Sequence, residues 1–281
     1  MKKSIKLKAK MQKVVVITGG TSGIGAELVE IYKKSKDVVC VLAKDRPAQN
    51  SDFWIENFYE CDISNEESVK RAMTDISAKH KKIDLLINCA GYGLAGAIEL
   101  TPSVDAEKQF ATNMMGTFYV NKSALPYMKR GSVIINISSA CALFALPYRG
   151  FYCASKSAVD MFSRCLNMEL SKSGIKVISV CPGDVKTNFS KNRVKVFATN
   201  ERYGNRIKNS IQKVEGNQEK RMSPTFVANK IAQFAEKKSP KPMYIIGAKY
   251  KFLYLANRIL PQRVMLYFTK KMFDWFAYVK T

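Results

Sequence analysis

The fold of this 281-residue chain can be predicted from one stretch near its start, Val14-Val-Val-Ile-Thr-Gly-Gly-Thr-Ser-Gly-Ile-Gly25. A β-branched apolar run, Val14–Thr18, leads into a glycine-rich turn and then into the helical pattern Gly25–Lys34. Glycines at such a turn let the backbone approach a pyrophosphate, and the amide groups that begin the helix face the phosphates. The spacing is GxxxGxG rather than GxGxxG, but the mechanics are the same. We therefore predict a cofactor-binding turn formed by Gly19, Thr21, Ser22, Gly23, Ile24 and Gly25.

The alternation of short apolar runs and longer helical patterns continues along the chain. The short runs lack the alternating polarity of half-buried strands, so we expect helices on both faces, which is typical of parallel strands. This predicts an α/β fold, a Rossmann-like doubly wound parallel sheet with right-handed crossovers, in a single domain over residues 14–247. The expected strands are Val14–Thr18, Val38–Ala43, Phe58–Cys61, Leu85–Asn88, Val133–Ser138, Lys176–Cys181 and Met243–Ile246. The expected helices are Gly25–Lys34, Glu66–His80, Val104–Lys129, Tyr152–Ser173 and Thr225–Lys237.

Three segments fall outside this alternation. Residues 1–13 carry six lysines and no acid, which indicates a basic N-terminal extension. Residues 186–221 carry ten Lys and Arg residues and three acids, and we expect them to form a substrate lid beside a ligand cleft. Residues 248–281 form a basic, aromatic tail that Pro261 divides into two amphipathic helical pieces.

Composition limits the classes of partner. Lys and Arg number 46 against 23 acids, and the formal charge of +23 favours a phosphorylated cofactor, a nucleic acid or an acidic membrane surface. The seven cysteines form no CxxC pair and the chain has one histidine, so we expect no metal site and no disulfide framework. A reducing, cytoplasmic location fits this cysteine usage. No apolar run is long enough to span a bilayer, and no nucleic-acid-binding module appears, so a nucleic acid is not expected as a partner.

The end of the second expected strand indicates which coenzyme would be bound. An NAD-selective site places an acid there to hold the ribose hydroxyls, but this chain has a small apolar residue followed by Lys44. The ammonium can pair with a 2′-phosphate, with Arg46 as a second candidate, whereas Asp45 opposes this interpretation and solvated loop charges are the alternative. NADP(H) is therefore favoured, with NAD(H) as the alternative. Asp62 and Ile63 follow the third strand and are expected at the adenine end, although Asp62 could equally cap the next turn.

A serine, a tyrosine and a lysine form the clearest catalytic pattern. Tyr152 and Lys156 lie four residues apart, so a helix would place them on one face. A phenol with a pKa of about 10 is a poor base at neutral pH, but an adjacent ammonium and an oxidised nicotinamide favour its phenolate. Ser139 is expected to end a strand, where its hydroxyl can hydrogen-bond a reacting carbonyl or alcohol oxygen. Asn113 could hold a helix-bulge carbonyl and a water that relays the proton.

Five motifs in this order resemble the short-chain dehydrogenase/reductase family over about residues 14–190. The motifs are Thr18-Gly-Gly-Thr-Ser-Gly-Ile-Gly25, Asn88-Cys-Ala-Gly91, Asn113 in an NxxG setting, Ser139 with Tyr152-x-x-x-Lys156, and Pro182-Gly-Asp-Val-Lys-Thr187. The resemblance implies that Tyr152 is the acid/base and that Lys156 binds the nicotinamide ribose. It places Ser139 on the substrate oxygen and Asn113 in the proton relay. It also implies further cofactor contacts from Asn88, Ala90, Gly91, Pro182, Gly183, Val185 and Thr187.

The implied reaction interconverts a ketone or aldehyde with an alcohol, by hydride exchange with the nicotinamide and proton exchange at Tyr152. Because a cytosolic NADP pool is usually reduced, we expect ketone reduction. The layout with an extended lid and a tail is similar to hydroxysteroid, retinol and long-chain ketone reductases, so a small lipophilic substrate is expected. The alternative is a non-catalytic nucleotide sensor or scaffold of the same fold, which has no need of a complete acid/base set.

The tail can place apolar residues on one strip with basic residues around it. The apolar residues are Phe252, Leu253, Leu255, Ile259, Leu260, Val264, Met265, Phe268, Met272, Trp275 and Phe276. Basic amphipathic helices with aromatic residues suit peripheral contact with an anionic membrane. They suit a dimer contact or a flap over the active site almost as well. The family resemblance also implies a homodimer or homotetramer.

Overall fold

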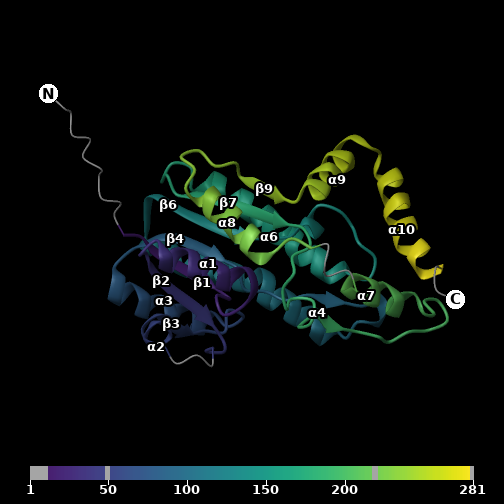
Figure 1. Cartoon of the computed structure of the whole chain (residues 1–281), viewed down its shortest axis with the longest axis horizontal. Helices are drawn as coiled ribbons and strands as arrows, with labels where there is room; N and C mark the ends of the chain where they lie inside the picture. Colours follow the sequence, from purple (N-terminus) through teal and green to yellow (C-terminus); the bar gives the residue numbers. More distant parts are fainter. Residues whose placement is uncertain (1–11, 48–50, 217–220, 279–281) are drawn as a thin grey trace.

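The computed structural model describes residues 12–47, 51–216 and 221–278, and within these it leaves the side chains of residues 213–216 and 272–278 undescribed. Seven parallel strands form the predicted doubly wound sheet, in the order β3-β2-β1-β4-β6-β7-β9 (Figure 1). The strands are β1 (Val14–Thr18), β2 (Val38–Ala43), β3 (Phe58–Glu60), β4 (Ile83–Asn88), β6 (Met128–Ile137), β7 (Lys176–Pro182) and β9 (Met243–Ile246). The predicted fold class is confirmed, and each expected strand exists with bounds shifted by two residues at most, except that β6 begins at Met128 rather than at Val133.

Helices cover both faces of this sheet, as the absence of alternating polarity in the strands predicts. On one face, α1 (Gly23–Lys34) and α8 (Pro224–Ala235) pack against apolar residues that include Val15 and Ile17 of β1. On the other face, α3 (Glu66–His80), α5 (Gly116–Ala124) and α6 (Gly150–Glu169) pack against residues that include Val14 and Val16. Successive strand residues point to opposite faces, so every residue of β1 is buried. Burial of each large aliphatic side chain contributes about 1.5–3 kcal/mol.

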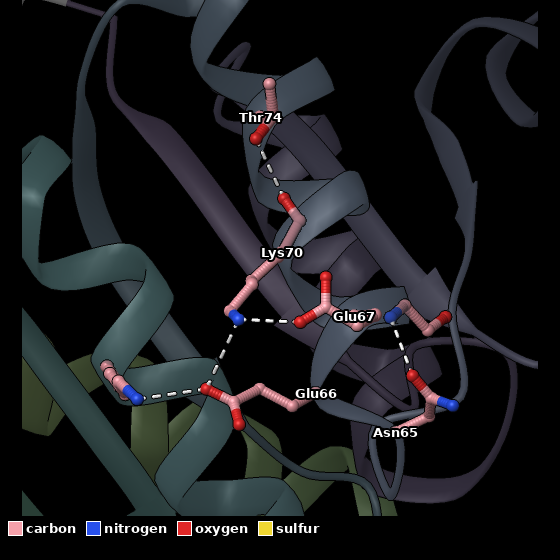
Figure 2. A network of polar contacts seen from close by, with 7 residues as sticks. Asn65, Glu66, Glu67, Lys70 and Thr74 are labelled. Carbon is pink, nitrogen blue, oxygen red and sulfur yellow. Dashed lines mark hydrogen bonds and ion pairs between the residues drawn. The ribbon is translucent and has the colours of Figure 1, made fainter.

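The start of α3 shows how polar residues fix one of these helices (Figure 2). The side chain of Asn65 accepts a hydrogen bond from the Ser68 amide at 2.9 Å and caps the helix. Glu66 and Glu67 occupy the first turn, where the helix dipole favours negative charge. Glu66 also accepts a hydrogen bond from Lys122 of α5 at 3.0 Å, so the first turn of α3 is connected to the neighbouring helix in the layer.

The prediction of one continuous helix over Val104–Lys129 is wrong. The structure divides it into α4 (Ser103–Phe110), a π-helical turn η2 (Ala111–Met115) and α5, and β6 already begins at Met128. A π-turn carries one extra residue and occurs frequently at functional sites. Here the close approach of Gly116 to Ile63, where an added Cβ would lie 2.8 Å from the Ile63 side chain, fixes the point at which α5 resumes.

Four elements were not predicted: three of them lack the length that a periodic pattern needs, and the fourth, a helix of 11 residues, lies in the charged segment that was expected as a lid. They are α2 (Asp52–Asn57), β5 (Leu94–Ala95), β8 (Val194–Lys195) and α7 (Arg206–Gly216). The strands β5 and β8 pair in parallel as a small second sheet. The segment expected as a lid therefore has a fixed strand and a helix of its own among the described residues.

The tail forms the two predicted helical pieces, α9 (Ala248–Ile259) and α10 (Gln262–Tyr278), which separate at Pro261. Figure 1 shows α9 leaving the sheet after β9 and α10 turning back toward α7, against which it packs. Met272, Trp275 and Phe276 of the expected apolar strip lie outside the described side chains, as residues 1–11 of the expected basic extension lie outside the described chain. Nowhere in the described ranges is a helix both long and apolar enough to cross a membrane.

Candidate active site

The glycine-rich turn after β1 has a geometry that side chains would prevent. Gly19 has φ of 65°, and a Cβ atom there would lie 2.8 Å from Cα of Ala90, which follows β4. A Cβ atom on Gly25 would overlap the carbonyl group of Gly19. Ser22 makes no side-chain capping bond to α1, and the first turn of that helix carries no acid. The helix therefore presents amide groups and positive dipole to the turn, as an anion site requires.

A pocket of about 480 Å³ lies at the carboxyl ends of β1, β4, β6 and β7. This is the edge at which parallel α/β sheets bind ligands. The predicted site residues that line it are Gly19, Ser22, Gly23, Ile24, Lys44, Ile63, Ala90, Gly91, Ser139, Tyr152, Lys156, Pro182, Gly183, Val185 and Thr187. The predicted residues outside its lining are Thr21, Gly25, Asp62, Asn88 and Asn113.

Ser139 and Tyr152 meet in this pocket from different elements. Ser139 follows the end of β6, and Tyr152 lies in the first turn of α6 with 8% of its surface exposed. Burial and the nearby Cys141 raise the pKa of the Tyr152 phenol, whereas a hydrogen bond with Ser139 and the positive charge of Arg193 lower it, and the net shift is upward. The phenol is therefore protonated at neutral pH.

Lys156 lies one turn further along α6, on the same side as Tyr152. It is 5% exposed, and its Nζ atom donates to the carbonyl oxygen of Ile137 at 2.8 Å. Burial lowers the pKa of Lys156 to about 8. The hydroxyl of Ser138 donates to the Lys156 carbonyl oxygen at 2.7 Å. These two bonds hold the end of β6 and the start of α6 together, and so fix the spacing of the catalytic residues predicted from the sequence.

Asn113 lies in the π-turn η2 and is fully buried. Its Oδ1 atom accepts from the Tyr92 amide at 3.1 Å, and its Nδ2 atom donates to the Tyr92 carbonyl at 3.0 Å and to the Ser155 hydroxyl at 3.1 Å. The side chain thus clamps the backbone after β4 to α6. The π-turn thus places Asn113 between these two elements, and its part in a proton relay stays a prediction.

The two residues expected at the coenzyme-selective end, Lys44 and Asp62, pair with each other. Lys44 Nζ lies 2.8 Å from Asp62 Oδ2, and Asp62 also accepts from the amide and the hydroxyl of Ser64 at 2.9 and 2.6 Å. Partial burial would raise the pKa of Asp62, but the bonds from Lys44 and Ser64 outweigh it and lower that pKa. Asp62 therefore caps its turn, which is the alternative that the sequence left open, and it holds the Lys44 ammonium at the pocket.

The side chain of Asn88 connects core elements of the fold by hydrogen bonds. Its Nδ2 atom donates to Asn121 at 2.9 Å and to Asn136 at 2.8 Å, and all three side chains are buried between β4, β6 and α5. Its side chain therefore points into the core behind the pocket.

Sequence reasoning missed several residues that line the pocket. Arg193 comes from the expected lid, and the charge of that segment was the available signal. Tyr250 comes from α9, and its hydroxyl donates to Asp184 at 2.5 Å. No local pattern marks Tyr250, because its place depends on how the tail returns to the loop after β7.

A turn shaped for phosphates, in the same pocket as a buried phenol and an ammonium, is the arrangement of a dinucleotide-dependent oxidoreductase with a parallel sheet. The comparisons with known proteins make this class more specific. The model of the short chain dehydrogenase family matches residues 13–196. The chain therefore belongs to the short-chain dehydrogenase/reductase family and is an oxidoreductase.

Known relatives match over most of the chain. A 3-ketodihydrosphingosine reductase of Bacteroides thetaiotaomicron is 31% identical over 259 residues, which cover 90% of this chain and 95% of that protein. A probable short-chain type dehydrogenase/reductase of Helicobacter pylori, VdlC, is 32% identical and covers 88% of this chain and 93% of its own. The solved structure of ElxO with NADP bound has 28% identity and a TM-score of 0.70, covering 86% of this chain and all of that one. The finer similarity to hydroxysteroid and retinol enzymes stays a prediction.

Proposed function

We propose that the protein reduces the ketone of a lipophilic substrate with NADPH. The observation that carries the proposal is the buried Tyr152 phenol, in contact with Ser139 and in one pocket with Lys156 and the glycine-rich turn. Burial keeps this phenol protonated, which suits the direction in which it gives up a proton to a carbonyl oxygen. The Bacteroides relative is itself named a keto-substrate reductase. A nucleotide sensor or scaffold would have no use for this buried acid.

The predicted catalytic residues and the loop after β7 each have a role in this reaction. NADPH supplies a hydride to the carbonyl carbon when it is bound. Ser139 donates a hydrogen bond to the carbonyl oxygen and orients it, and Tyr152 transfers its phenolic proton to that oxygen as the alcohol forms. The Lys156 ammonium would hold the nicotinamide ribose and stabilise the phenolate that remains. Asn113 would connect the Lys156 ammonium to the proton relay. The loop after β7 supports the nicotinamide through Pro182, Gly183, Val185 and Thr187.

The coenzyme assignment rests on the glycine-rich turn and on Lys44. Gly19 and Gly25 leave room for a pyrophosphate, and the uncapped start of α1 offers it amide groups. Lys44 lines the pocket and offers a cation to a 2′-phosphate. ElxO, a relative of the same fold at 28% identity, was solved with NADP bound. These features favour NADPH over NADH.

A second cavity supports a lipophilic substrate. Of the residues between Ser139 and Tyr152, Ala142, Leu143 and Phe144 line a cavity of about 300 Å³ that neighbours the first pocket. Met265 and Leu266 of α10 also line it, together with polar residues (Ser157, Asn257, Gln262 and Thr269), and Cys141 lines both cavities. An apolar chain attached to the reacting ketone would enter this cavity, while Phe189 and Arg193 of the expected lid line the first pocket.

A panel of ketones and aldehydes with apolar chains of increasing length, read by loss of NADPH absorbance, tests the proposal. The panel is run with NADPH and with NADH, and the matching alcohols are run with the oxidised coenzymes. We expect reduction to become more efficient as the chain lengthens, with NADPH preferred. Absence of turnover with every carbonyl compound, in protein that binds NADPH, would favour the non-catalytic alternative.

We also propose that the protein is cytoplasmic and binds peripherally to an anionic membrane surface through its tail. Phe252 and Ile259 of α9 are 70% and 71% exposed, and Lys249, Lys251 and Arg258 lie on the same helix. Because Tyr250 lines the pocket, deletion of the tail would also damage the active site. The double variant Phe252→Ser/Ile259→Ser is the better test, and it should abolish flotation with anionic liposomes while turnover of a short ketone stays unchanged.

The family resemblance supports a homodimer or homotetramer. Met161 and Met168 of α6 are exposed large apolar side chains on the outer layer, and they would be covered by a second copy. Light scattering coupled to size-exclusion chromatography measures the state, and a monomer at micromolar concentration would refute this part of the proposal.

A further inference from the structure

Arg193 is held beside the reacting phenol by the small second sheet. It directly precedes β8, whose first residue, Val194, donates its amide to the carbonyl of Gly93 at 2.9 Å. The guanidinium carbon lies 5.8 Å from the centre of the Phe189 ring, and that ring lies 5.6 Å from the Tyr152 ring. The Phe189 ring is therefore a common neighbour of the Arg193 guanidinium and the Tyr152 phenol, and all three residues line the same pocket.

Two nitrogen atoms of the Arg193 guanidinium have no hydrogen-bond acceptor in the described part of the chain. Its Nε and Nη1 atoms are buried, and neither has an acceptor among the residues that the structure describes. A buried charged donor without a partner costs free energy, so such groups are rare unless they serve a ligand. Gly93 leaves room for the group, since a Cβ atom there would lie 3.1 Å from Arg193 Nε. Because arginine stays charged at every physiological pH, the missing partner is a hydrogen-bond acceptor that carries negative charge.

The rest of the pocket does not neutralise this charge. Arg221 also lines it and donates to the Ser190 hydroxyl at 2.7 Å. Of the described residues in the lining, Asp184 alone carries a carboxylate. That carboxylate already accepts a hydrogen bond from the hydroxyl of Tyr250. The substrate side of the pocket is therefore cationic as well as apolar.

We propose that the substrate carries an anionic group, a phosphate or a carboxylate, a few bonds from the ketone, and that Arg193 binds it. This inference rests on the proposed reduction at Tyr152 and specifies the substrate class. The phosphates of the coenzyme face the glycine-rich turn and Lys44, whereas Arg193 contacts Phe189 on the side of the reacting group. The substrate is thus an anionic amphiphile, with its charge at Arg193, its ketone at Tyr152 and its chain in the cavity lined by Leu143 and Met265.

Matched ketones of one chain length test this inference. The set is a 2-oxoalkyl phosphate, a 3-oxoalkanoate, the methyl ester of that acid and a 1-amino-2-alkanone. We expect kcat/KM to be highest for one of the two anionic ketones, which also identifies the anion, and lowest for the amine. Arg193→Met should lower kcat/KM for the anionic ketones by about ten- to a hundredfold, as loss of a hydrogen bond to a charged group does. The ester should change by less than about threefold.

Lys191→Met is the matched control, because it removes one charge from the same exposed segment without touching the pocket lining. It should leave the ratio between anionic and neutral ketones unchanged. Calorimetry with the turnover-blocked Tyr152→Phe variant gives a readout independent of rate, and in it Arg193→Met should weaken binding of the anionic ketone and leave the affinity for NADPH unchanged.

Two results would overturn the inference. Equal efficiency for the ester and the anionic ketones would show that Arg193 does not select charge, while the proposed reduction would still stand. A loss of NADPH affinity in Arg193→Met, with the ketone ratio unchanged, would assign the guanidinium to the coenzyme. Failure to reduce any member of the set would instead refute the proposed function itself.

Discussion

The substitution Lys44→Ala tests the coenzyme assignment through one ammonium group. Lys44 is 59% exposed and lies 2.8 Å from Asp62, so it must exchange this pair for a bond to the 2′-phosphate when NADPH binds. A hydrogen bond between charged groups contributes about 1.5–3 kcal/mol, and an exposed ion pair contributes about 0.2–1 kcal/mol. The difference predicts that Lys44→Ala weakens NADPH binding by about 0.5–2.8 kcal/mol, or about two- to a hundredfold in Kd.

The assay is equilibrium titration of the protein with each reduced coenzyme, read by the change in nicotinamide fluorescence. NADH has no 2′-phosphate, so its Kd should change by less than about twofold. The control Lys34→Ala removes an equal charge from the far end of α1 and should alter neither Kd. Asp62→Asn should tighten NADPH binding, because it releases the ammonium and removes a nearby negative charge. Equal losses for NADPH and NADH in Lys44→Ala would refute the assignment.

Three further substitutions test the packing and the charges around the site. Gly183→Ala should lower the free energy of unfolding by about 1–3 kcal/mol, because the new methyl group would overlap the Tyr250 ring, and Tyr250→Ala in the same chain should restore most of that loss in a urea titration. Burial lowers the pKa of Lys156 to about 8 from 10.5, so the unfolded chain binds more protons between these pH values. The free energy of unfolding relative to Lys156→Met should therefore rise with pH across that window, by up to about 3 kcal/mol, and parallel curves would contradict this. Asn65→Ala removes the cap of α3 and should cost about 1 kcal/mol of unfolding free energy, whereas Thr74→Ala, farther along the helix, should cost less than half as much.

Much of the fold could be predicted from the sequence because its strands are buried on both faces. The expected bounds of β1 and β2 agree with the structure, since runs of β-branched residues between turns have few alternative conformations. The break between α4 and α5 could not be predicted in the same way. It depends on Asn113 reaching the backbone of Tyr92 and on Gly116 packing against Ile63, and these contacts join residues far apart in the chain.

The candidate site was predictable where motif residues are neighbours in sequence or follow a strand directly. Ser139, Tyr152 and Lys156 come together because the end of β6 lies beside the start of α6. The other wall of the pocket was not predictable, because Arg193 lies in a segment without a regular pattern and the place of Tyr250 depends on how the tail returns to the loop after β7. The sequence also left two roles open for Asp62, and only its contacts with Lys44 and Ser64 distinguish them.

The removal of a single hydroxyl group tests the central claim, that Tyr152 donates the proton. Tyr152→Phe is mixed with NADPH and a substrate ketone, and hydride transfer is followed in a single turnover by the loss of NADPH absorbance. The rate should fall by about 10²–10⁴-fold while the Kd for NADPH changes little, and Tyr119→Phe, which alters α5 outside the pocket lining, should keep the wild-type rate. A wild-type rate in Tyr152→Phe would contradict the assignment of the acid.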